Sequence, residues 1–164
     1  TRDWSSDVCS SDLTLFRKKC LQMMQNQIPK NHMDIPWHQF TGSDKSLPIT
    51  QTGLTEKASV IGRTGLMMLS CGTGAWRVRS SMNSLATLLG VTCTADIGLM
   101  SIEYTCFDGT DCYSQSLCLT NTGVNTSKLN RLERFVNDFD HECCTMSGEQ
   151  IHTYLDQIEQ IHGL

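Results

Sequence analysis

The sequence predicts an α+β domain in which two helices precede a β-hairpin and two more follow it. Apolar residues recur at intervals of three and four on both sides of a central stretch, which is the spacing of amphipathic helices. The central stretch is instead rich in β-forming residues and contains an Asp-Gly pair, which favours a hairpin turn. The expected order is therefore α-α-β-β-α-α, with helices and sheet packed as layers.

Length and charge fit one such domain and exclude one class of partner. The chain has 164 residues, of which 39% are hydrophobic and 18% are charged, enough for one compact unit and a tail. The 13 Lys and Arg residues are outnumbered by 17 Asp and Glu residues, giving a formal net charge of −4. Because no basic excess is available to neutralise phosphates, we expect no nucleic-acid partner.

The first third of the chain is expected to lie outside the domain. Residues 1–13 resemble the conceptual translation of a sequencing adapter joined in frame to a gene fragment, and we interpret them as an artefact. Residues 14–54 combine a short basic run with scattered Pro and Gly and no sustained period, so we expect a tail or linker with at most a short helix. The domain is expected over residues 55–164.

The first two helices are predicted between Thr55 and Leu89. The sequence Cys71-Gly-Thr-Gly74 interrupts the apolar pattern, and the second helix starts at about Thr73. Gly90 then occupies the position that follows a helix C-cap. We expect an antiparallel helical hairpin that turns at Cys71–Gly74, with anion binding by the same glycines as the alternative.

The hairpin and the last two helices follow. The runs Thr92–Phe107 and Asp111–Leu119 are the expected strands, on either side of Asp108-Gly109. Ser147 and Gln150 predict a capping box at the start of the last helix. There is no run of about 18 apolar residues, so no membrane span is expected within this sequence.

The cysteines and histidines give only weak signals. Since the predicted helices supply a core and no signal peptide is visible, we expect free thiols rather than a disulfide scaffold. Cys112 and Cys118 should share a strand face, with Cys106 across the hairpin from Cys112. A zinc cage formed by these cysteines and His141-Glu-Cys-Cys144 is the alternative, but no C-x-x-C pair supports it, and we expect no cofactor. Four histidines are expected to face solvent: His32, His38, His152 and His162.

A longer pattern joins the first two helices. It reads Gly65-Leu-Met-Met-Leu-Ser-Cys-Gly72-Thr-Gly-Ala-Trp76-Arg77-Val78, followed by a ladder of Met82, Ala86 and Leu89-Gly90-Val91, and later by Gly123-Val-Asn125 and Lys128-Leu129. Over about residues 57–163 this pattern resembles the N-terminal soluble domain of the threonine/serine exporter family. We expect each residue of this family motif to have a structural or a functional role: Gly65, Gly72, Trp76, Arg77, Val78, Met82, Ala86, Gly90, Gly123, Asn125 and Leu129.

The resemblance implies a fragment of a bacterial membrane protein for amino-acid export. The chain would be its cytoplasmic domain, acting as a regulatory or assembly module, with the membrane-embedded transport domain beyond Leu164. The implied partners are that membrane domain, further copies of the chain in a homo-oligomer, and threonine or serine through the full-length protein.

Individual motif residues have simple structural interpretations beside functional ones. Val78, Met82 and Ala86 are expected in the core. Arg77 is expected to pair with an acid or a carbonyl, with a functional contact as the alternative. Asn125 is expected to cap the next helix, with substrate or partner contact as the alternative.

Two other functions stay open. A hydrolase-like domain would need a nucleophile near a base, and Cys106 or Cys112 with His141 is the candidate set. Positions where this family commonly carries acids are Gly74 and Arg79 here, and Thr122 replaces a basic residue, so we assign no catalytic residue. The other alternative is a structural module that self-associates through its first two helices.

Overall fold

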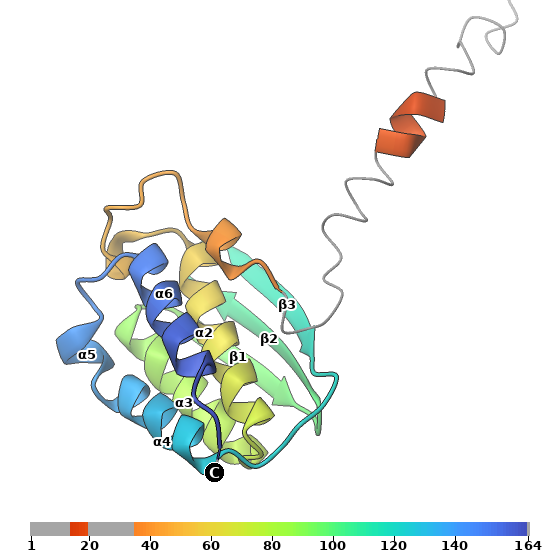
Figure 1. Cartoon of the computed structure of the whole chain (residues 1–164). Helices are drawn as coiled ribbons and strands as arrows, with labels where there is room; N and C mark the ends of the chain where they lie inside the picture. The colour runs from red at the N-terminus through yellow and green to blue at the C-terminus, as the bar shows by residue number, and fades with distance from the viewer. Residues whose placement is uncertain (1–13, 20–34, 164) are drawn as a thin grey trace, which may run out of the picture.

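A three-stranded antiparallel sheet forms one side of the molecule, and two layers of helices stack on one of its faces (Figure 1). The computed structural model describes residues 14–19 and 35–163. The elements are η2 (Trp37–Phe40), η3 (Ile49–Gln51), α2 (Leu54–Ser70), α3 (Ala75–Leu88), β1 (Thr92–Ile97), β2 (Ser101–Phe107), β3 (Cys112–Cys118), α4 (Thr126–Asn137), α5 (Phe139–Glu142) and α6 (Gly148–Glu159). Helices α2 and α3 lie against the sheet, and α4 and α6 cover them. The predicted α+β class and the two C-terminal helices are confirmed.

Helix α2 lies between the other elements and is buried nearly all round. Of its 17 residues, 13 are buried, which is the pattern of a helix with neighbours on every side. Two glycines allow these neighbours to come close. A Cβ at Gly62 would meet the Tyr104 ring of β2, with Cε1 at 2.7 Å, and one at Gly65 would lie 2.6 Å from Met82 Sδ of α3.

The expected turns at Gly72 and Gly109 are confirmed. Gly72 has φ +84° between α2 and α3, and Gly109 has φ +100° between β2 and β3. A side chain is strained in this left-handed region, so glycine suits both turns. The chain can therefore reverse sharply at each point.

The sheet has one strand more than expected. The run from Thr92 to Phe107 is not one strand but two, because the chain turns after Ile97, where Gly98 donates to the carbonyl of Ser101 over 2.8 Å. In β1 the odd-numbered residues face the helices, whereas in β2 the even-numbered residues do. This change of phase within a β-rich run is what a tight turn produces.

The position predicted for Cys106 is wrong. Cys106 lies opposite Cys93 on one side and Tyr113 on the other, whereas Cys112 lies opposite Phe107. A difference of one residue in register places two side chains on opposite faces of a sheet. Cys106 is consequently buried against the helices and Cys112 is exposed.

The segment before α2, expected as a tail or linker, belongs to the packed unit from Ile35 onward. Trp37 and Ile49 are buried in the core. Ile49 donates its N–H to the Met146 carbonyl over 2.8 Å, which attaches this segment to the start of α6. Residues 14–19 are helical. The adapter interpretation of residues 1–13 and the expectations for residues 20–34 lie outside the described residues.

Candidate functional site

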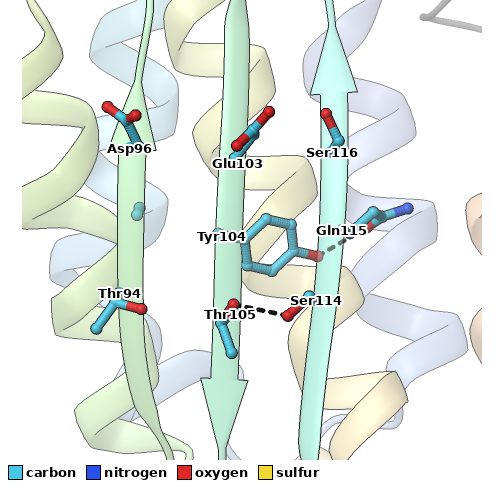
Figure 2. Close-up of a pocket in the computed structure, with 9 residues that line it drawn as sticks. Thr94, Asp96, Glu103, Tyr104, Thr105, Ser114, Gln115 and Ser116 are labelled. Carbon is cyan, nitrogen blue, oxygen red and sulfur yellow. Dashed lines mark hydrogen bonds between the residues drawn. The ribbon is translucent and has the colours of Figure 1, made fainter.

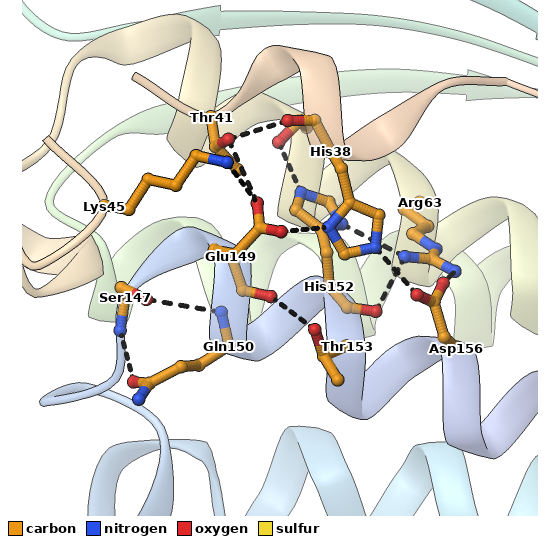
Figure 3. A network of polar contacts seen from close by, with 11 residues as sticks. His38, Thr41, Lys45, Arg63, Ser147, Glu149, Gln150, His152, Thr153 and Asp156 are labelled. Carbon is orange, nitrogen blue, oxygen red and sulfur yellow. Dashed lines mark hydrogen bonds and ion pairs between the residues drawn. The ribbon is translucent and has the colours of Figure 1, made fainter. Parts of the chain in front are cut away.

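A polar cluster with a buried centre lies where η2, α2 and α6 meet (Figure 3). We call it the polar junction. It consists of His38, Glu56, Ser59, Arg63, Glu149, His152, Asp156 and Glu159. These residues come from three elements that are distant in sequence, so the fold is needed to bring them together.

Arg63 is the central cation of the polar junction. It is only 2% exposed, and its guanidinium pairs with Asp156 and, over 3.3 Å, with Glu159. Burial would raise the pKa of Asp156, but hydrogen bonds from Arg63 and His38 outweigh it and lower that pKa. Burial raises the pKa of Glu159 despite the same guanidinium. The buried cation is thus compensated mainly by Asp156.

His152 is held in one tautomer. The Ser59 hydroxyl donates to the Glu56 carbonyl over 2.6 Å, so its oxygen is an acceptor for His152 Nε2 at 2.9 Å. Arg63 can only donate, and its Nη1 lies 3.2 Å from His152 Nδ1. His152 therefore carries its proton on Nε2. Burial, followed by the charges of Arg63 and His38, lowers its pKa to about 3.

The hydrogen bond between His152 and Ser59 runs in the opposite direction from that between a catalytic base and its nucleophile. A general base would use a free imidazole nitrogen to take the hydroxyl proton. Here the Ser59 proton points to a carbonyl, and the only lone pair of His152 accepts from Arg63. Among the described residues, neither thiol of the predicted set contacts His141. Cys106 is buried beside Cys93, and Cys112 is exposed at the start of β3. His141 is an exposed residue of α5 that forms an ion pair with Asp140.

His38 lies between two carboxylates. Its Nε2 is 2.7 Å from Asp156 Oδ2 and its Nδ1 is 3.0 Å from Glu149 Oε1, the latter outside the direction of a good hydrogen bond. His38 thereby fastens the segment before α2 to α6.

Glu56 ties the same segment to α2 and α6. Its carboxylate accepts the Gly42 N–H over 3.2 Å. It also lies against the first residue of α6, where a Cβ at Gly148 would be 2.9 Å from Glu56 Cδ. The position suits an anion, since helix N-termini are electropositive. Burial, together with the charge of Glu149, nevertheless raises the pKa of Glu56.

The polar junction is therefore best suited to fastening elements and to coupling their stability to pH. Among residues 14–19 and 35–163, no three His, Cys, Asp or Glu side chains are grouped so that they could hold a metal ion. All seven cysteines that the structure describes are free, as expected.

The face of the sheet turned away from the helices carries a shallow hollow of about 710 Å³ (Figure 2). The outward side chains that line it are Thr94, Asp96, Glu103, Thr105, Ser114 and Ser116. Asp96 and Glu103 are opposite each other in the strand register, and Thr105 and Ser114 are hydrogen-bonded over 2.7 Å. The hollow offers hydroxyls and two carboxylates, and helices leave it uncovered.

Several motif residues from the sequence are structural. Val78, Met82 and Ala86 are buried, as expected, and Leu129 is half-buried against the core. Gly65 provides the close approach of α2 to α3 described above. Gly90 follows α3 with φ +73°.

Other motif residues meet at the turn between α2 and α3. Gly123 donates its N–H to Ser70 O, and Asn125 donates its N–H to Cys71 O. The Asn125 side chain accepts from Lys128 N over 3.0 Å, which confirms the predicted cap of α4.

The predicted partner of Arg77 is also found. It forms an ion pair with Glu133 over 3.1 Å, while its neighbour Trp76 is exposed. The predicted capping box of Ser147 and Gln150 is likewise present. Their N–H groups and side chains are joined reciprocally, over 3.1 and 3.2 Å.

The polar junction itself was not predicted from the sequence. The expectation that His152 faces solvent is wrong, since this residue is fully buried. A signal existed: His152 belongs to the inward stripe of α6 together with Ile151, Leu155 and Ile158. His38 is half-buried, His162 is exposed, and His32 lies outside the described residues.

Comparison with known proteins gives one family. The family model ThrE, described as "Putative threonine/serine exporter", matches residues 59–163. No curated protein and no solved structure matches the chain. Within the part of the chain that the structure describes, no helix is long and apolar enough to cross a membrane. Because the matched region makes up well over half of the sequence, the chain belongs to the threonine/serine exporter family.

Proposed function

We propose that this domain is the cytosolic N-terminal module of a bacterial threonine/serine exporter, and that it regulates or assembles the transporter rather than forming the translocation path. Family membership over residues 59–163 carries the proposal. Its first partner is the membrane domain expected beyond Leu164, and a second copy of the chain is the next. Threonine or serine is handled by the full-length protein.

The uncovered face of the sheet supports a regulatory role. Helices pack on one side only, which leaves the hollow with Asp96 and Glu103 open to a partner. Self-association through both early helices has less support, because α2 buries 13 of its 17 residues inside the domain. Of these two helices, α3 has the larger exposed face.

Export of threonine from cells tests the regulatory role. The full-length gene is expressed in bacteria that lack a threonine exporter, and efflux of labelled threonine is measured at equal amounts of membrane protein. The double variant Asp96→Asn plus Glu103→Gln neutralises both carboxylates of the hollow, and we expect it to change the efflux rate. The matched control neutralises two exposed carboxylates elsewhere, Asp111→Asn with Glu142→Gln, and should leave it unchanged. Equal efflux from all three proteins would contradict a regulatory role for this face.

Labelling of Cys112 tests the cytosolic placement. This thiol is exposed, and a Cys112→Ser variant identifies its share of the signal. A membrane-impermeant maleimide is expected to label Cys112 of the full-length protein in inverted vesicles but not in intact cells. Labelling in intact cells would place the domain on the other side of the membrane.

A further inference from the structure

Four large apolar side chains are exposed near one another in the fold, on three different connections. The exposed fractions are 69% for Trp76, 93% for Leu99, 37% for Met100 and 83% for Val124. Trp76 lies at the start of α3, Leu99 and Met100 form the turn between β1 and β2, and Val124 precedes α4. Exposed apolar residues that gather in this way mark contact surfaces, whereas single ones need no explanation.

Contacts between these connections place them at the same end of the domain, which we call the apolar end. A Cβ at Gly72, in the turn before α3, would lie 3.6 Å from Val124 Cγ2. Met100 accepts the N–H of Leu119 over 2.7 Å, at the start of the segment that leads to Val124. In Figure 1 these connections lie at the end of the molecule where the C-terminus is marked.

Cations accompany the apolar residues. The Arg77 guanidinium lies 5.5 Å from the centre of the Trp76 ring, and Arg79 is exposed two positions further along. Glu133 neutralises Arg77. Arg79 instead donates to the Ala95 carbonyl, and among the described residues no carboxylate forms an ion pair with it. Tryptophan beside arginine is the combination found where proteins meet the headgroup region of a bilayer.

We infer that the apolar end contacts the surface of a lipid bilayer that contains anionic headgroups. Trp76 and Leu99 enter the interface, and Arg79 faces the headgroups. The described chain ends at Gly163 on this same end, where Asn125 Nδ2 donates to Ile161 O over 3.0 Å. A membrane domain that followed Leu164 would leave from the surface that meets the lipid.

This inference goes beyond the proposed function, and vesicle flotation tests it with the whole chain. Phosphatidylcholine vesicles with and without phosphatidylglycerol are floated with the wild type and with Trp76→Ala plus Leu99→Ser. We expect binding to anionic vesicles and a loss of about tenfold or more in the double variant. The control replaces two apolar residues exposed elsewhere, Leu88→Ser plus Phe107→Ser. No binding by the wild type, or an equal loss in the control, would overturn the inference.

Fluorescence of Trp76 gives a second readout that needs no change to the surface. In a Trp4→Phe background the remaining tryptophans are Trp76 and the buried Trp37. Anionic vesicles should shift the emission of Trp76 to the blue, and brominated lipids should quench it. If light scattering instead shows a dimer that Trp76→Ala converts to a monomer, a second copy covers the apolar end and the inference fails. Threonine export is not part of either readout, so this inference and the proposed function can fail separately.

Discussion

Arg63 donates a hydrogen bond to Nδ1 of His152 over 3.2 Å, and this contact decides which protonation state of His152 the fold accepts. An imidazolium would direct a second N–H at the guanidinium, so the folded domain keeps His152 neutral. In the unfolded chain the same ring is free to take a proton near its ordinary pKa of 6.5. The first prediction follows from this difference.

Stability should fall as the solution is acidified below about pH 6.5. The pKa of His152 is lowered to about 3 in the folded state, so the unfolded chain binds one proton more between these two values. The stability contributed by neutral His152 is complete above 6.5 and decreases by about 1.4 kcal/mol per pH unit below it. Urea unfolding at several pH values should show a shallower slope for His152→Gln than for the wild type. Identical slopes would mean that His152 is not the titrating group.

Removal of the central cation should be costly. In Arg63→Met, the carboxylates of Asp156 and Glu159 lose their partner in a partly buried setting, and we expect a loss of about 3–5 kcal/mol in the free energy of unfolding. The control is Arg79→Met. The exposed Arg79 guanidinium donates to the Ala95 carbonyl, and its removal should change stability by less than about 0.5 kcal/mol. Similar losses in both variants would contradict the central place of Arg63.

A methyl group at Gly62 should destabilise the domain even though alanine is the better helix former. The added Cβ would meet the ring and hydroxyl of Tyr104, so α2 and β2 must separate, with a loss of about 1–3 kcal/mol. Gly123→Ala serves as the control, because nothing lies within 4 Å of its Cβ. Thermal unfolding should separate the two variants. A Gly62→Ala protein as stable as the wild type would refute the close packing of α2 on the sheet.

Asn125 has two roles that substitutions can separate. Asn125→Ala removes both the cap of α4 and the bond to Ile161 O, and should cost about 1 kcal/mol or more. Asn125→Asp keeps an oxygen for Lys128 N but loses the amide donor to Ile161, so its loss should be smaller. Chemical denaturation of the two variants measures the difference. An aspartate variant as unstable as the alanine variant would assign the whole effect to the C-terminal contact.

Local patterns in the sequence were sufficient for the four long helices α2, α3, α4 and α6, but not for the short helices η2, η3 and α5. The capping residues Ser147 and Asn125 and the turn at Gly72 each depend on a few neighbouring residues, and all are present as predicted. The turn after Ile97 was missed because its signal is a change of phase within a continuous β-rich run. Gly65 and Met82 of the family motif were likewise readable, since they bring α2 and α3 close together.

The polar junction could not be read in the same way. His38, Arg63 and His152 are separated by 25 and 89 residues along the chain, and no local rule pairs them. Their meeting depends on how α6 and the segment before α2 pack on α2. The burial of Arg63 is equally a tertiary effect, because an arginine on an isolated amphipathic helix is expected in solvent.

The most direct test of the exporter account is the DNA sequence beyond the codon for Leu164, read in one continuous molecule. The account predicts that the reading frame continues into several apolar stretches of about 20 residues each, enough for a membrane domain. A stop codon after Leu164, with no membrane-protein gene beside it, would contradict the account and leave a domain that acts alone.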